Sequence, residues 1–200
     1  MAVWRVGYFA SPCEFTPRDL CGWNHRFDDP QREYRTIYAA DKKETCLREV
    51  LADLRPSKKA LADFKKNFGD DDALKCAGLV TRALRRKHVL VQADIAVSAG
   101  TAADIESAAV LRDLSERLGH TLDTARVRGK DRALTRAASR LLYSDGHSGI
   151  RFRSRLDAFP CHALFEGRAH LDQRGKATSL TEPIAELIAV AREYGLTLVN

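Results

Sequence analysis

Apolar residues recur with the 3.6-residue period of an α-helix in several parts of the chain. The clearest case is 134–142, where apolar residues at 134, 137, 138, 141 and 142 share one face. We expect a helix here that ends at Asp145-Gly146. The same spacing predicts a helix over 108–118 that is closed by Gly119.

Three further helices are predicted from the same periodicity. After Tyr38 an apolar stripe begins, which consists of Cys46, Leu47, Val50, Leu51 and Leu54. We expect Asp41 to cap this helix with Glu44 completing a capping box, and Pro56 to end it. Residues 71–86 are predicted as a second helix. The third covers 184–191 and is closed by Gly195 before an apolar tail at 196–199.

Strand patterns are scattered between these helices. Alternating, β-branched and aromatic residues predict strands over the ranges 3–8, 35–40, 88–95, 149–155 and 163–165. Helices and strands therefore follow one another irregularly, which favours an α+β fold over a doubly wound parallel sheet. A length of 200 residues predicts a single domain over 1–200.

Composition limits the class of protein. No apolar run approaches the ~18 residues of a membrane span, and Arg5 interrupts the start where a signal peptide would be apolar. We therefore expect a soluble, cytoplasmic protein with no membrane association. The net charge of +6 and the isoelectric point of 9.2 favour an anionic ligand. A nucleotide phosphate, an acidic protein and nucleic acid fit this charge equally well.

Cysteine and histidine positions do not indicate a metal site. The five cysteines are scattered, and neither they nor the six histidines have the spacing of zinc ligands. We expect free thiols in a reducing compartment, no metal and no prosthetic group.

Four segments carry the residues with candidate chemistry, and together they resemble the RES domain family, which is named after an Arg, a Glu and a Ser. The segments are His25-Arg26-Phe27-Asp28-Asp29-Pro30, Tyr34-Arg-Thr-Ile-Tyr38-Ala-Ala, Glu44-Thr-Cys-Leu-Arg-Glu49 and Gly149-Ile-Arg-Phe-Arg-Ser154-Arg. The resemblance extends over about residues 5–165, and it leaves 180–200 as a C-terminal helix and strand.

The resemblance implies a fold and an activity. Members of the family are similar to ADP-ribosyltransferases, so we expect a mixed sheet core flanked by helices. The family includes bacterial toxins that consume NAD+ by hydrolysis or phosphorolysis, and a companion antitoxin with a helix-turn-helix domain usually neutralises them. NAD+ is then the substrate, and nucleic acid is contacted only indirectly, through the antitoxin. The family pattern would place Arg26 and Tyr38 on NAD+, Glu49 at the reacting bond and Ser154 beside the ribose or nicotinamide.

The chemistry of breaking the nicotinamide–ribose bond suits these residue types. The reaction passes through an oxocarbenium-like state, which a carboxylate such as Glu49 would stabilise. Arg26 would anchor the phosphates or ribose, and Tyr38 would pack on nicotinamide. His25 adjoins Arg26 and is a weaker candidate for a substrate contact.

One departure from the family pattern affects the completeness of the site. Many relatives have an Asn between the Ser and a final Leu-Phe strand, whereas this chain has Cys161-His162. Either side chain would replace the hydrogen bond of the Asn, or the contact is lost. We include Cys161 among the candidate substrate contacts.

Each candidate also has an ordinary structural interpretation. Glu49 lies at the border of its apolar stripe, as a solvated helix charge would, although Asp53 at i+4 repels it. Arg26 could pair with Asp28 or Asp29 in a turn, and Tyr38 could be a core residue. The row formed by Arg132, Arg136 and Arg140 is expected to be a solvated face, with a surface for an acidic partner or nucleic acid as the alternative.

Three functional hypotheses therefore remain beside NAD+ cleavage. An enzyme that transfers ADP-ribose to a macromolecule would use the same first half-reaction. A basic module would bind nucleic acid through residues 126–155, and a catalytically idle relative would act only as an interaction partner. The apolar residues within 184–199 would pack internally or against a second copy in a homodimer.

Overall fold

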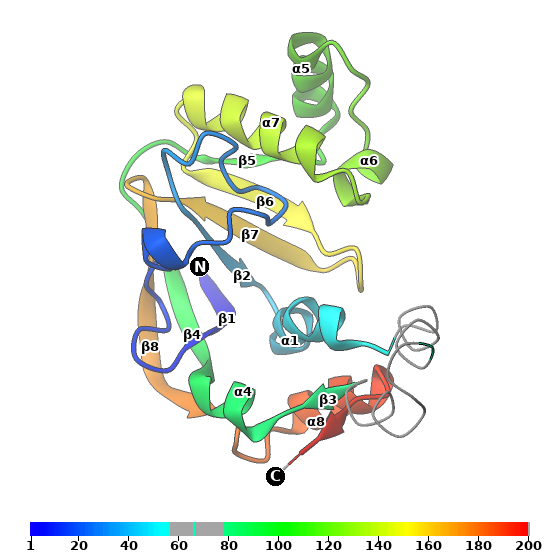
Figure 1. Ribbon diagram of the computed structural model, residues 1–200. Helices are drawn as coiled ribbons and strands as arrows, with labels where there is room; N and C mark the ends of the chain where they lie inside the picture. The colour runs from blue at the N-terminus through cyan, green and yellow to red at the C-terminus, as the bar shows by residue number, and fades with distance from the viewer. Residues whose placement is uncertain (57–65, 67–77, 200) are drawn as a thin grey trace.

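A seven-stranded mixed sheet forms the centre of the computed structural model, which describes residues 1–56, 66 and 78–199 (Figure 1). The strand order is β5-β6-β7-β2-β1-β4-β8, and all neighbours are antiparallel except β5 and β6. The strands are β1 (Ala2–Tyr8), β2 (Thr36–Ala40), β4 (His88–Val97), β5 (Ala102–Asp104), β6 (Gly149–Arg153), β7 (Pro160–Phe165) and β8 (Ala169–Ser179).

The longer helices pack into the larger of two hydrophobic clusters. Helix α1 contacts β1 and β2, and α7 contacts β6 and α5 (Figure 1). The helices are α1 (Lys43–Leu51), α4 (Arg82–Lys87), α5 (Ala108–Leu118), α6 (Thr124–Arg128), α7 (Arg132–Ser144) and α8 (Ala185–Glu193), with 3-10 turns η1 (Arg18–Leu20) and η2 (Ala52–Leu54). None of the described helices is long and apolar enough to cross a membrane.

The second cluster is smaller, and none of the described helices contributes a residue to it. Ile37, Ala39 and Leu164 are buried there, and the partly buried Cys13 and Phe15 of the loop after β1 pack against the cluster. The two clusters account for the alternation along β2, in which successive side chains point to opposite faces. The α+β prediction with a mixed sheet flanked by helices is confirmed.

Most predicted elements are present. The helix predicted over 71–86 is wrong at 79–80, which form the strand β3 (Leu79–Val80), whereas 82–86 lie in α4 as predicted and 71–77 lie outside the described residues. The apolar tail forms β9 (Thr197–Leu198), which pairs in parallel with β3. Strand β8 was not predicted, because its residues are mostly polar and exposed on both faces.

The predicted capping box of α1 is also wrong. Lys42 occupies the N-cap without a side-chain hydrogen bond, and Asp41 instead lies 2.7 Å from His162 Nε2 through its Oδ1 atom. The Asp41 carboxylate thus contacts His162 and does not cap the helix, as the sequence had suggested.

Helix α8 packs on α1 within the same chain. Leu187 and Val190 of α8 are buried, and two ion pairs join the helices. Lys43 Nζ lies 3.1 Å from Glu186 Oε1, and Arg48 Nη2 lies 2.7 Å from an oxygen of Glu193. Internal packing, one of the two expectations for the C-terminal segment, is therefore observed.

The sheet opens between β1 and β2. These strands share a single registered pair, Trp4 with Ala40, whereas β1 and β4 pair along the full length of β1. Arg5 enters the opening, where its Nη1 donates to Tyr38 O at 2.7 Å. On the helix side, Val6 N donates to Cys46 Sγ at 3.0 Å, which attaches α1 to β1. This opening gives rise to a cleft.

Candidate active site

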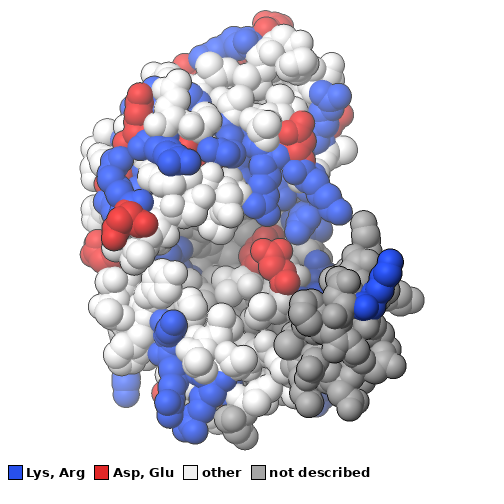
Figure 2. All heavy atoms as spheres, viewed as in Figure 1, with Lys and Arg blue, Asp and Glu red and all other residues white. Residues whose placement is uncertain are grey.

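A cleft of about 960 Å³ lies where β1 and β2 diverge. Residues of both strands, of α1, of the loop before β2 and of the segments beside α6 and β6 line it, and Figure 2 shows a hollow on this face. Its volume is at the upper end of the range for small-molecule sites, which suits a ligand as large as a dinucleotide.

Helix α1 directs Glu49 into the cleft, and a buried serine holds its carboxylate. Ser154 follows β6 and is 1% exposed. Its Oγ donates to Glu49 Oε1 at 2.6 Å and accepts from Leu156 N at 3.1 Å. The backbone donor orients the hydroxyl, so its proton points at the carboxylate. Ser154 therefore lies behind Glu49 and is not part of the cleft lining.

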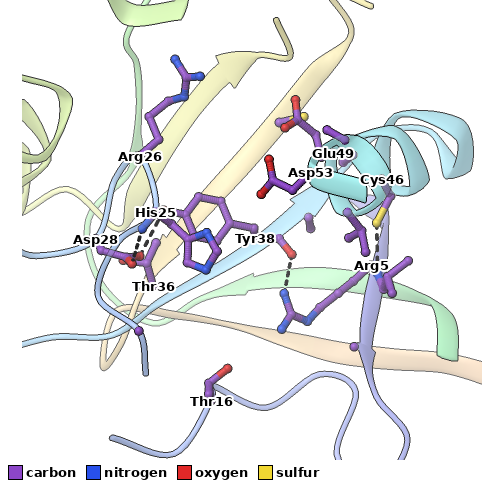
Figure 3. Close-up of a pocket in the computed structure, with 18 of the residues that line it drawn as sticks. Arg5, Thr16, His25, Arg26, Asp28, Thr36, Tyr38, Cys46, Glu49 and Asp53 are labelled. Atoms are coloured by element: carbon purple, nitrogen blue, oxygen red, sulfur yellow. Dashed lines mark hydrogen bonds between the residues drawn. The ribbon is translucent and has the colours of Figure 1, made fainter. Parts of the chain in front are cut away.

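Tyr38 projects from β2 into the cleft and anchors the preceding loop (Figure 3). Its hydroxyl accepts from Phe27 N at 3.0 Å and donates to Asp28 Oδ1 at 3.3 Å. Burial, reinforced by the negative charge of Asp28, raises the pKa of Tyr38 well above its usual value. The phenol therefore remains protonated, and the residue lines the cleft.

His25 and Arg26 are carried by the same loop. The His25 ring lies 5.7 Å from the Tyr38 ring, centroid to centroid, and Arg26 Nη1 donates to Val127 O. Burial lowers the pKa of Arg26, and the charge of Glu49 opposes this shift. Arg26 is thus close enough to Glu49 for a direct electrostatic effect. Its predicted alternative, a turn ion pair with Asp28 or Asp29, is not formed, and Asp29 pairs with Arg140 instead.

The Cys161-His162 pair is divided between the two faces of the sheet. Cys161 pairs with Ala40 and lines the cleft, and burial raises the pKa of its thiol, which therefore stays protonated. His162 points to the opposite face and contacts Asp41. Of the two residues, only Cys161 lines the cleft. A substrate contact by Cys161 stays a prediction.

His162 makes stability depend on pH. Burial lowers its pKa from the usual 6.5, although Asp41 opposes the shift. Below about pH 6.5 the unfolded chain binds a proton that the folded chain excludes, so the free energy of unfolding should fall as the pH decreases. Urea unfolding at about pH 7.5 and 5.5 measures this loss. His162→Gln, which has no titrating ring, should lose less stability between the two pH values; an equal loss in both proteins would contradict the prediction.

The row of arginines on α7 is not a solvated face, and that prediction is wrong. Arg132 donates to Asn24 O, Arg136 Nε donates to Asp28 O at 3.2 Å, and Arg140 Nη1 lies 3.4 Å from an Asp29 carboxylate oxygen. All three thus bind the loop that carries His25 and Arg26. The loop is distant in sequence, so helical periodicity alone gave no sign of this contact.

The cleft therefore brings together five of the six predicted site residues, with Ser154 directly behind one of them. The five are His25, Arg26, Tyr38, Glu49 and Cys161. Sequence reasoning did not assign six further basic residues of the lining to the site, although one of them, Arg155, closes the fourth family segment. The six are Arg5, Arg35, Arg55, Lys130, Arg132 and Arg155. Among the described residues, no group of three or more His, Cys, Asp or Glu side chains could hold a metal ion.

Comparison with known proteins gives one family and one related fold. A sequence model of the RES domain matches residues 2–182. A chain in the crystal structure of the M. tuberculosis MbcT-MbcA toxin-antitoxin complex is similar, with a TM-score of 0.53 and 15% sequence identity over 96% of this chain and 87% of that one. At this identity the likeness shows a common fold. No curated protein matches significantly.

Proposed function

The chain belongs to the RES domain family, and on this basis we propose that it binds NAD+ as a substrate and cleaves the bond between nicotinamide and ribose. The observation that supports this most strongly is the Glu49 carboxylate, which a buried serine hydroxyl holds at 2.6 Å beside a cleft with a cationic lining. A fixed carboxylate of this kind stabilises positive charge without having to reorganise during the reaction.

We assign residues of the cleft to the binding of NAD+ and to the cleavage of its bond to nicotinamide. Arg26 anchors the anionic part of NAD+, and the Tyr38 ring packs on nicotinamide. As the bond to nicotinamide breaks, its electron pair leaves with the ring nitrogen and positive charge develops on the ribose. Glu49 stabilises this charge and orients the ribose hydroxyls. Water or phosphate then adds to the ribose carbon and loses a proton.

Ser154 acts in this scheme through Glu49. Ser154→Ala removes a short hydrogen bond to a charged group, so we expect kcat to fall about tenfold while KM changes little. Steady-state release of nicotinamide measures both constants. Ser144→Ala, which removes a serine hydroxyl from the exposed end of α7, is the matched control. A large rise in KM without a change in kcat would instead indicate direct contact between Ser154 and the substrate.

The direct test of the proposal follows nicotinamide release from NAD+ by the purified protein, with and without phosphate. We expect release in at least one condition. ADP-ribose as the second product indicates water as the acceptor, and a phosphorylated ADP-ribose indicates phosphate. Radiolabel from adenylate-labelled NAD+ that becomes attached to protein would indicate a transferase. Absence of nicotinamide in all conditions would refute the proposal.

The biological role that fits this activity is that of a toxin with a cognate antitoxin. The support is membership of a family that includes NAD+-consuming toxins and a fold shared with a chain of a toxin-antitoxin complex. We expect expression of the wild-type chain to stop bacterial growth by depleting NAD+. Co-expression of the adjacent open reading frame should restore growth if it encodes the antitoxin. Growth arrest with an unchanged NAD+ level would contradict this role.

A further inference from the structure

Four basic side chains line the cleft near Glu49. We call Arg26, Lys130, Arg132 and Arg155 the basic wall. They come from the loop before β2, the connection between α6 and α7, the start of α7 and the segment after β6. Figure 2 shows Lys and Arg side chains along the edge of the hollow on this face. Segments far apart in sequence thus place positive charge on one surface of the cleft.

Several arginines near the basic wall have acidic partners, and the wall has none among the described residues. Outside the cleft, Arg128 binds Glu106 at 2.7 Å and Arg151 binds Asp104 at 2.8 Å. Part of the positive charge over 126–155 is therefore neutralised away from the cleft. This pairing also weakens the hypothesis that the whole region is a nucleic-acid surface.

Within the basic wall the known contacts are to neutral groups. Arg26 donates to the carbonyl of Val127, and Arg132 donates to the carbonyl of Asn24. Lys130 and Arg155 have neither a hydrogen bond nor an ion pair with any described residue. The positive charge of the wall is therefore left without a paired carboxylate in the part of the chain that the structure describes.

The positive charges of the basic wall repel one another. Arg155 and Arg132 both contribute to lowering the pKa of Arg26, in addition to its burial. Like charges at a partly desolvated surface oppose folding. At Arg26 the charge of Glu49 acts against this repulsion. A bound anion would offset it across the whole wall, because each guanidinium and the ammonium would gain a charged acceptor.

We propose that the basic wall binds the diphosphate of a dinucleotide, with Lys130, Arg132 and Arg155 as additional binding residues. The proposal rests on the proposed function, since it assigns the phosphates of the same substrate. Two linked phosphates offer several acceptor oxygens and two negative charges to four cations. The diphosphate is attached to the reacting ribose, so it must lie near Glu49, and the basic wall is near Glu49 through Arg26.

The consequence is selectivity for ligands that contain a diphosphate. ADP-ribose carries the diphosphate and lacks nicotinamide, so it tests the wall without the reaction. Calorimetric titration should compare wild type with Lys130→Gln and Arg155→Gln, which remove charge from side chains that have no partners among the described residues. We expect the Kd for ADP-ribose to rise about tenfold in each variant, as for loss of one charged contact. Inorganic pyrophosphate should show the same losses.

Arg151→Gln is the matched control. Arg151 is an exposed arginine of β6 outside the cleft lining, and its replacement changes the net charge equally. The Kd of this variant should match that of wild type. Unchanged affinity for ADP-ribose in the Lys130 and Arg155 variants would overturn the proposal. The proposal would also be overturned if inorganic phosphate, and not ADP-ribose, bound through these residues. The wall would then hold a free acceptor phosphate.

The outcome can be separated from that of the proposed function. If ADP-ribose binds through the basic wall and NAD+ releases no nicotinamide, the diphosphate site stands and the catalytic proposal fails. If nicotinamide is released and the KM for NAD+ is the same in wild type and both variants, the catalytic proposal stands and the diphosphate site fails. Tighter binding of a single-stranded oligonucleotide than of ADP-ribose, lost in the same variants, would also overturn the diphosphate assignment.

Discussion

Glu49→Gln should lower the rate of nicotinamide release from NAD+ about 100-fold or more, the usual effect of removing a charge-stabilising group from an active site. The substitution keeps the size of the side chain and its ability to accept the Ser154 hydrogen bond, so the fold should persist. It removes the negative charge that opposes the developing positive charge on the ribose. We therefore expect the loss in kcat, with NAD+ affinity changed much less.

The control for this experiment is Glu44→Gln on the same helix. Glu44 lies in the first turn of α1 and is outside the cleft lining, so its variant should retain wild-type kcat. Circular dichroism of both variants verifies that they are folded. A Glu49→Gln protein that is as active as wild type would show that the assigned mechanism is wrong, even if the NAD+-cleaving activity itself is real.

Phe27→Ala should lower the free energy of unfolding by about 3–5 kcal/mol, the range for truncating a buried aromatic side chain. Phe27 lies between Arg26 and Asp28 in the loop, and its side chain is fully buried. Its ring contacts the Phe152 ring edge-on, with 4.9 Å between centroids. This side chain therefore attaches the loop that carries His25 and Arg26 to β6, and its removal leaves a cavity under the cleft.

Urea unfolding of the Phe27→Ala variant measures the loss, and Phe9→Ala provides the comparison. Phe9 is also in the loop region before β2, but its side chain is 67% exposed. Its replacement should change the free energy of unfolding by no more than about 0.5 kcal/mol. Equal effects of the two substitutions would contradict the anchoring role of Phe27.

Local pattern predicts an element well when one of its faces is buried and the other is solvated. Helix α7 and strand β2 meet this condition, and their predicted positions agree with the structure. Strand β8 does not, because it is an edge strand with mostly exposed side chains, and its pairing with β4 is fixed by a distant segment. The hydrophobic periodicity of one segment does not reveal such a partner.

Candidate side chains were predictable where a motif surrounded them. Glu49 and Tyr38 were identified through their neighbours in sequence, and both line the cleft. The positions of Asp41 and Arg136 were misjudged because their partners, His162 and the backbone of Asp28, are more than 100 residues away. A capping residue or a charged helix face is ordinary by local criteria, and only tertiary structure reveals the competing acceptor or donor.

The packing of α8 on α1 limits how far the chain can be truncated at its C-terminal end. The family match ends at residue 182, three residues before α8 begins. A fragment that ends there would contain every candidate site residue. It would lack Glu186 and Glu193, which form ion pairs with Lys43 and Arg48 on the helix that carries Glu49. The folded unit is therefore longer than the segment that matches the family model.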